Sequence, residues 1–510
     1  MAPSSYPSAL VFSSLILVFV VLLKRWHTAS RQPFPPGPKP KLFIGNLLDI
    51  PTERPWLTYT EWGKRYGHIT HFEAFGNHVV VLNSLKAATE LLEKRTRNYS
   101  DRPNLPIMDL MGWGICLSIM RHGGVWRQYR RLFHQYFRRD AIPTYHPIYE
   151  RKIQGFLRNL LSTPEHFVDH IKTLSAAIIM ATMFGYEVNP TNDPFVGLAE
   201  EGVRLFAQGL VPGRFAVNTF PILRYFPSWF PGCGFHRFAR DASEVIERMK
   251  TLPFKFVQQN MQHGVGASSV VREMLESPNS LNCDSVEEME TTIKNVAAVG
   301  YAAANETTAA TLLVFFLAMA LNPPVLRKAQ EEIDSVVGPG RIPQMGDRPG
   351  LPYCEAMVRE LYRFLPTVPL AIPHATLEDD FYEGYFIPKG TTIIPNVWAM
   401  THDESVYTNP DEFRPERFLD KDGQLNSDDR VLGFGFGRRI CAGRYAADAV
   451  NWLAIVSTLS IFDIEKAKDE NGMVIPIEPR LANEVITHPM PFKCAITPRN
   501  HETRKVVEGN

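Results

Sequence analysis

The longest helical pattern in the chain begins near Asp284 and ends at two prolines, Pro323 and Pro324. Asp284 and Ser285 can cap its N-terminus, glutamates follow in the first turns, and the prolines cannot continue the helix. From Ala309 onward the segment is apolar on all sides, which is typical of a helix surrounded by other elements. The sequence therefore predicts a chain that folds around one long helix in a large core.

Shorter patterns complete a mainly α chain with small β-sheets. Helical periodicity is found at 85–95, at 322–338 and directly after residue 443, whereas 68–83 is β-prone and 377–403 has the Gly and Pro spacing of short hairpins. Beyond Leu42 there is no low-complexity linker and no internal repeat. Although 510 residues are enough for several domains, these features favour one folded body.

The N-terminal residues predict a membrane anchor. Residues 6–23 are uncharged and mostly aliphatic, and Lys24, Arg25 and Trp26 follow them. A cleaved signal peptide carries its positive charge before the apolar stretch, so we favour a single transmembrane helix over a signal peptide or a buried core helix. Residues 31–41 are rich in proline and predict a stiff hinge, or alternatively a ligand for a proline-binding domain.

Charge and cysteine usage exclude several classes. Lys and Arg together number 54, as do Asp and Glu, so the chain lacks the basic excess of a nucleic-acid-binding protein. The six cysteines are scattered without a CxxC pair, which argues against a zinc module and against a disulfide framework. Reduced thiols facing the cytosol are the simpler interpretation.

One cysteine lies in a glycine- and arginine-rich loop, "FGFGRRICAGR" (434–444). The glycines superficially resemble a dinucleotide-binding turn, which would leave the cysteine without a role. A predicted helix follows, and its N-terminus favours a thiolate at Cys441. No local histidine or aspartate offers a base for a nucleophilic cysteine. A thiolate ligand to a metal cofactor that carries carboxylates would use the cysteine, the glycines and the arginines together.

This loop resembles the FxxGxRxCxG signature of the cytochrome P-450 superfamily of haem-thiolate monooxygenases, at Phe434, Gly437, Arg439, Cys441 and Gly443. The resemblance implies that Cys441 is the axial ligand of a haem b iron and that Arg439 faces a haem propionate. A thiolate ligand favours O–O cleavage.

The resemblance covers nearly the whole chain after the anchor. It implies the cytochrome P-450 fold, with one catalytic domain at 42–498 and a C-terminal tail at 499–510.

Two further motifs match the family. Glu360 and Arg363 form an ExxR pair and Arg417 lies in "FRPERF", which implies a buried network that supports the haem loop; alone, such a pair is usually a solvated surface pair. Trp126 and Arg130 form a WxxxR motif, which implies contacts to a haem propionate. By itself it also fits an amphipathic helix with a snorkelling arginine. The basic residues around it could also meet an acidic electron donor.

The long helix carries the segment "AANETT" (303–308), which resembles the family's oxygen-binding motif. Glu306 and Thr307 match the acid–alcohol pair that helps deliver protons to dioxygen, although a mid-helix threonine often only bonds back to its own helix. Ala304 departs from the usual glycine, which puts the local helix distortion in doubt. Asn98 and Asn305 fit glycosylation sequons that we expect to be unused.

The function implied is oxidation of a lipophilic small molecule with dioxygen and electrons from an NADPH-cytochrome P-450 reductase. Stretches such as "VPLAIPHATLEDD" (368–380) look like fungal microsomal members, which implies the endoplasmic reticulum membrane, a cytosolic catalytic domain, and a terpenoid, polyketide or indole-type substrate. By family position, the pocket draws on 101–120, 205–232, 368–372 and 484–487. Two alternatives remain: a haem-thiolate isomerase or dehydratase that needs no external electrons, and a non-catalytic haem protein that binds a ligand.

Overall fold

A computed structural model describes residues 33–189, 192–277 and 283–508. The predicted anchor at 6–23 and the first two residues of the predicted hinge lie outside the described residues.

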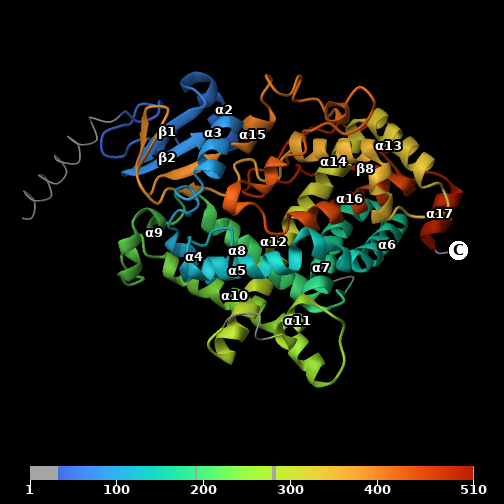
Figure 1. Ribbon diagram of the computed structural model, residues 1–510, viewed down its shortest axis with the longest axis horizontal. Helices are drawn as coiled ribbons and strands as arrows, with labels where there is room; N and C mark the ends of the chain where they lie inside the picture. Colours follow the sequence, from blue (N-terminus) through green and yellow to red (C-terminus); the bar gives the residue numbers. More distant parts are fainter. Residues whose placement is uncertain (1–32, 190–191, 278–282, 509–510) are drawn as a thin grey trace, which may run out of the picture.

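The helices of the described chain form most of the fold (Figure 1). In chain order they are α2 (Pro55–Tyr66), α3 (Leu85–Ala88), α4 (Pro106–Leu110), α5 (Gly124–Phe137), α6 (His146–Ser162), α7 (Phe167–Phe184), α8 (Pro194–Leu210), α9 (Ala216–Thr219), α10 (Phe235–Gln262), α11 (Val270–Glu276), α12 (Val286–Leu321), α13 (Pro323–Val336), α14 (Pro352–Phe364), α15 (Val397–Thr401), α16 (Arg444–Ile461) and α17 (His501–Glu508). The strands are β1 (Ile69–Ala74), β2 (Asn77–Leu82), β3 (His374–Ala375), β4 (Asp380–Tyr382), β5 (Tyr385–Ile387), β6 (Thr392–Pro395), β7 (Phe462–Lys466) and β8 (Cys494–Pro498). The prediction of a mainly α chain with small sheets is confirmed.

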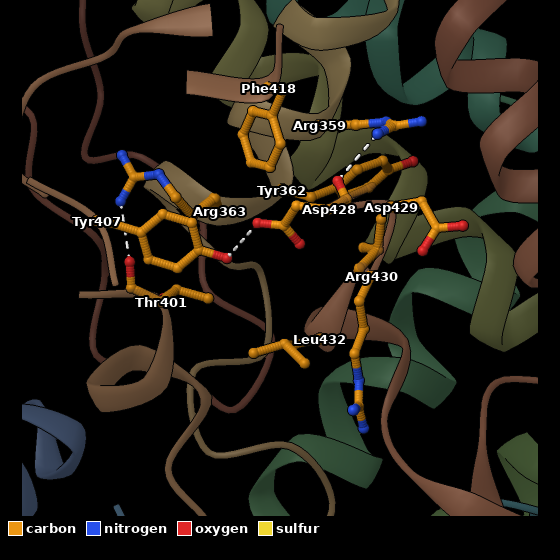
Figure 2. A pocket seen from close by; sticks show the side chains of 11 residues that line it. Arg359, Tyr362, Arg363, Thr401, Tyr407, Phe418, Asp428, Asp429, Arg430 and Leu432 are labelled. Carbon is orange, nitrogen blue, oxygen red and sulfur yellow. Dashed lines mark hydrogen bonds between the residues drawn. The ribbon is translucent and has the colours of Figure 1, made fainter. Parts of the chain in front are cut away.

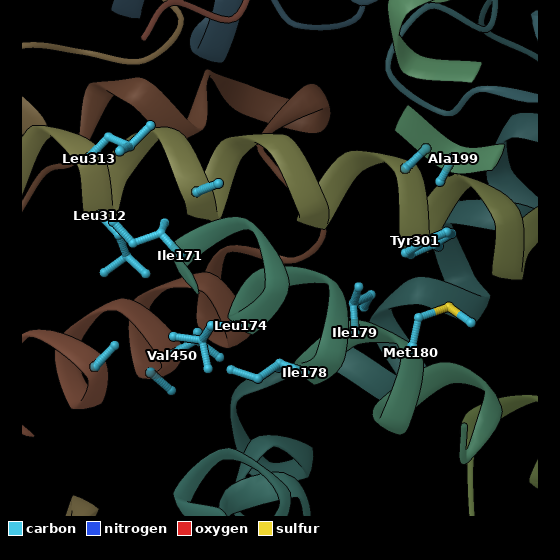
Figure 3. Close-up of a cluster of buried hydrophobic side chains, with 14 of the residues drawn as sticks. Ile171, Leu174, Ile178, Ile179, Met180, Ala199, Tyr301, Leu312, Leu313 and Val450 are labelled. Carbon is cyan, nitrogen blue, oxygen red and sulfur yellow. The ribbon is translucent and has the colours of Figure 1, made fainter. Parts of the chain in front are cut away.

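The long helix α12 is the axis of the helical body, as the sequence predicts. The Ser285 side chain accepts a hydrogen bond from the Glu288 amide at its start, and the helix ends before Pro323. Every residue from 308 to 320 is buried. Figure 3 shows α7 and α16 side chains, such as Ile171 and Val450, gathered beside α12.

The main sheet has the strand order β1-β2-β6-β3. The β-prone residues 68–83 contain β1 and β2, which form an antiparallel hairpin, and β4 and β5 form a second hairpin. The expectation of hairpins throughout 377–403 is wrong for β6, which pairs parallel to β2, and for α15, which is helical. β6 also pairs antiparallel with β3, but its parallel partner β2 lies far back in the chain, and local turn spacing contains no information about it.

The described part of the proline-rich segment is attached to this sheet. The Pro36 carbonyl accepts a hydrogen bond from the His71 amide at 3.0 Å, and the ring of Phe34 stacks on His71 and His78. A Cβ atom on Gly37 would lie 1.8 Å from the His71 carbonyl oxygen. Residues 33–38 therefore have a fixed place against the sheet.

Two described helical stretches, 164–184 and α12, are long and apolar enough to span a membrane. Their most apolar windows are 72% and 78% buried within the fold, so we interpret both as core helices. At the C-terminus, residues 501–508 of the predicted tail form α17, in which Thr503 and Val507 are buried.

Candidate active site

The cysteine loop is folded against a turn from the N-terminal part of the chain. Gly437 has φ +53°, and a Cβ atom there would lie 2.2 Å from the Leu92 carbonyl oxygen, so only glycine fits. The Cys441 amide donates to the Phe434 carbonyl at 2.7 Å, which closes the loop directly before α16. Leu92 belongs to η2 (Thr89–Lys94), a π-helical turn where periodicity predicts ordinary helix. Such irregular turns are frequent at functional sites.

The surface of Cys441 is accessible to solvent. Many protein atoms nevertheless surround its thiol, and this burial raises the pKa of the thiol. The Gly443 amide and the cations of Arg130 and Arg444 lower the pKa, but burial outweighs them. The contact at the start of α16 thus lowers the pKa of the thiol in the direction that the sequence predicts, although burial opposes it. A bound metal ion deprotonates a coordinating thiol outright, so it would stabilise the thiolate against the effect of burial.

Arg439 and Trp126 are brought together beside this loop. The Arg439 guanidinium lies 4.2 Å from the centre of the Trp126 ring, and its Nε donates to the Ser100 carbonyl at 2.7 Å. Burial lowers the pKa of Arg439 to about 10. Both side chains are buried, yet Arg439 Nη2 and Trp126 Nε1 have no hydrogen-bond partner among the described residues. Buried donors of this kind are costly unless an acceptor satisfies them.

A second buried arginine, Arg102, extends this cluster, and the sequence did not single it out. One of its terminal nitrogens donates to the Ile372 carbonyl, while its Nε has no partner within the described chain. Burial and the charge of Arg439 hold the pKa of Arg102 well below its usual range. Burial and the charge of Arg102 likewise lower the pKa of His374, whose Nδ1 lies 2.7 Å from the Tyr99 carbonyl. The two buried guanidinium groups of Arg102 and Arg439 are suited to bind the carboxylates of a cofactor.

Arg130 lies one helical turn from Trp126 on α5, and its charge acts on Cys441 and Arg444. Burial lowers the pKa of Arg130. Gly443 has an ordinary φ of −92°, and a Cβ atom there would meet no described atom within 4 Å. Protein packing therefore does not explain a glycine at position 443.

The second motif forms a buried ion-pair network. Glu360 is fully buried, and its carboxylate accepts hydrogen bonds from Arg363 at 2.6 and 2.8 Å. It also accepts hydrogen bonds from Arg417 Nε at 3.1 Å and from the Arg414 amide at 2.8 Å. These contacts exclude the alternative of a solvated surface pair.

Figure 2 shows Arg363, one member of this network, near Asp428 and Arg430 of the segment that leads into the cysteine loop. Arg363 donates to the Thr401 carbonyl at 3.0 Å, and the Tyr407 hydroxyl donates to Asp428 at 3.0 Å. The cavity beside these residues measures about 10 Å³, which suits a single water molecule rather than a substrate.

The "AANETT" segment is helical throughout. The Thr307 hydroxyl donates to the Ala303 carbonyl at 2.9 Å, and Ala303 is exposed even though this part of the helix lies in the core. Ala304 lies within the continuous helix α12. Ser175 of α7 donates to the Asn305 carbonyl at 2.6 Å. Asn305 itself is buried, which leaves no room for a glycan on its sequon.

A second residue that the sequence did not indicate is His488. Its Nε2 lies 3.3 Å from the Glu306 carboxylate and its Nδ1 lies 3.3 Å from the Glu484 carboxylate. No motif connects positions this far apart in the chain, so only the folded structure reveals the contact.

Comparison with known proteins agrees with this arrangement. The family model for cytochrome P-450 matches residues 35–495. A cytochrome P-450 monooxygenase of Coprinopsis cinerea is 40% identical, over 95% of this chain and 96% of the relative. One of Rhodocybe pseudopiperita is 39% identical, over 100% and 98%. One of Aspergillus oryzae is 37% identical, over 97% and 96%.

Proposed function

This chain belongs to the cytochrome P-450 family and is a monooxygenase, and on that premise we propose that it hydroxylates a lipophilic small molecule with electrons from an NADPH-cytochrome P-450 reductase. The reaction consumes substrate, dioxygen, NADPH and one proton, and it yields hydroxylated substrate, water and NADP⁺. The observation that carries the proposal is the accessible Cys441 beside buried arginines, each with one nitrogen that has no partner among the described residues.

The residues present fit a haem b. Cys441 would hold its iron through the thiolate, and Arg439, Trp126 and Arg102 would donate to its propionates, which would satisfy their orphaned nitrogens. When bound, the haem supplies the redox chemistry that activates dioxygen. The Glu360 network supports the loop that holds Cys441, through the segment before it.

On the α12 side, Thr307 and Glu306 would hold and move protons. The Thr307 hydroxyl donates to its own helix, so it must turn away from the Ala303 carbonyl to act on a bound molecule. Rotation about one side-chain bond suffices for that change. Ala303 and Thr307 are both accessible, which supports a role for this face of α12.

The substrate is proposed to be apolar, of the terpenoid, polyketide or indole type. Support comes from the apolar character of the segments that family position assigns to the pocket. The fungal relatives make a pathway of secondary metabolism a reasonable proposal.

We further propose that the catalytic domain rests on the endoplasmic reticulum membrane from the cytosolic side. Large apolar side chains are exposed around α9 and the β1–β2 turn, at one end of the molecule in Figure 1, and the rings of Phe75 and Phe220 touch there. Exposed members of this group are Phe43, Ile222, Tyr225 and Trp229. Such a patch fits a lipid surface. In a chain that lacks the predicted anchor, Trp229→Ser is expected to weaken vesicle binding, and equal binding with and without this substitution would contradict this part.

Turnover in a reconstituted system tests the function. The full chain and an NADPH-cytochrome P-450 reductase are placed in lipid vesicles with terpenoid, polyketide and indole probes under isotopically labelled dioxygen. A product that carries one labelled oxygen and requires NADPH is expected. A product formed equally well without NADPH would instead assign the chain to the isomerase or dehydratase class.

A further inference from the structure

Three charged groups in a line connect solvent to the face of α12 that carries Glu306. Glu306 is 24% exposed and pairs with His488 Nε2 at 3.3 Å, and His488 is 21% exposed. On its other side, His488 Nδ1 lies 3.3 Å from Glu484, which is 60% exposed. Glu306 directly precedes Thr307 on the helix. The imidazole is thus the link between a solvated carboxylate and the carboxylate next to Thr307.

The loop that carries His488 is held in place by backbone bonds. The His488 carbonyl accepts a hydrogen bond from the Ala482 amide at 2.7 Å, and the Met490 amide donates to the Arg480 carbonyl at 2.7 Å. The Thr487 amide donates to the Thr367 carbonyl, also at 2.7 Å. The histidine therefore reaches Glu306 from a loop attached on both sides.

The charges around His488 favour its protonated form. Burial lowers the pKa of His488, but its bonds to Glu306 and Glu484 outweigh burial and raise the pKa to about 9. Lys172 of α7 also acts on this group of charges, because together with His488 it lowers the pKa of Glu484. At neutral pH the line thus consists of an imidazolium between two carboxylates, with a lysine near its outer end.

We propose that protonated His488 positions Glu306 and passes it the protons that the proposed monooxygenase reaction consumes. In each transfer the Nε2–H bond of His488 breaks and an O–H bond on Glu306 forms, which leaves a neutral imidazole and a protonated carboxyl. A proton from solvent then restores the imidazolium, and no electrons move. This role rests on the proposed function, and it makes His488 a positioning residue that acts through Glu306.

The test compares His488→Gln, Glu484→Gln and wild type as holoenzymes with reductase in vesicles. Glutamine at 488 can still donate a hydrogen bond to Glu306 but cannot titrate. NADPH oxidation without added substrate is followed from about pH 6 to about pH 10, and each rate is divided by the wild-type rate at the same pH, so that the reductase's own pH dependence cancels. His166→Gln is the control, because this histidine is also near a carboxylate, Asp169, but lies 61% exposed outside the line.

The ratio for His488→Gln is expected to be about one fifth or less at neutral pH, a smaller loss than removal of a general acid itself causes. It should rise toward one above about pH 9, where wild-type His488 also loses its proton. The ratio for Glu484→Gln should fall only in the alkaline range, since loss of that carboxylate lowers the pKa of His488. His166→Gln should stay near one. A ratio for His488→Gln that does not vary with pH, at any value, would overturn the proposal.

A second readout does not depend on turnover. Histidine ring carbons are titrated by NMR in the reduced, carbon-monoxide-bound holoprotein, and the His488 signal is assigned by its loss in His488→Gln. A pKa near 9 that falls in Glu306→Gln is expected, and a pKa near the ordinary value of about 6.5 would refute the ion-pair line. If the wild type forms a normal carbonyl complex but oxidises no NADPH, the proposed function fails, and the NMR result still reports on the line itself.

Discussion

Replacement of Glu360 by glutamine tests whether burial makes the Glu360 network essential. The carboxylate is fully buried and accepts bonds from two guanidinium groups and one backbone amide. Glutamine keeps the shape but removes the charge, and it turns one acceptor into a donor that faces other donors. Arg363 and Arg417 then remain buried without a counter-charge.

The expected cost follows from that burial. Breaking a buried ion pair by removing one partner costs about 3–5 kcal/mol. The chain offers a matched control in Glu201 and Arg204, which have the same spacing of three residues and equally short contacts of 2.6 and 2.7 Å. Their side chains are 41% and 57% exposed, so Glu201→Gln should cost less than about 1 kcal/mol.

Urea unfolding of the two holoproteins measures the difference. With a slope of about 3 kcal/mol per M, Glu360→Gln should lower the midpoint by about 1 M or more and Glu201→Gln by about 0.3 M or less. The slope itself should stay the same, because the surface exposed on unfolding does not change. Equal midpoint shifts for the two variants would refute the argument that burial decides the cost.

Two further predictions concern the haem loop. Gly437→Ala should abolish haem retention, because the new Cβ would lie 2.2 Å from the Leu92 carbonyl oxygen at a residue with positive φ. Gly433→Ala should retain haem, because a Cβ atom there meets no described atom within 4 Å. Equal haem content in both variants, measured by haem absorbance per protein, would contradict this prediction. Arg439→Ala should release haem faster to an apomyoglobin acceptor, by about tenfold or more, because Arg439 is buried and its Nη2 has no partner in the described part of the chain. Arg438→Ala, at an exposed position, should match wild type. Identical release rates for the two variants would exclude the propionate contact.

Local signals in the sequence predict the long helix well. Ser285 caps α12 and Pro323 follows its end, as the pattern of caps and prolines indicates. The stretch after Ala309 is buried because its residues are apolar except Thr311, whose hydroxyl donates to the Thr307 carbonyl of the same helix. Such features depend on residues close together in the chain, so no knowledge of the fold is required.

The site itself is predicted only in part. The loop around Cys441 and the spacing of Glu360 and Arg363 are visible in the sequence, but the burial of that pair is not. Burial depends on how α14 packs on residues 409–417, and spacing on one helix is the same for buried and exposed pairs. The exposed pair at Glu201 has the same spacing and geometry.

Arg102 and His488 could not be found from local patterns. Arg102 meets Arg439, and His488 meets Glu306, only because distant parts of the chain fold together. Isolated arginines and histidines are common, and neither lies in a motif. The parallel pairing of β6 with β2 was missed for the same reason.

The most direct test of the account is the absorbance spectrum of the reduced, carbon-monoxide-bound protein, for wild type and for Cys441→Ala. A strongly red-shifted Soret band in the wild type, absent from a variant with an unchanged far-ultraviolet circular dichroism spectrum, is the predicted result. The same Soret position in both proteins would contradict it, because Cys441 would then not be the ligand that its loop is folded to present.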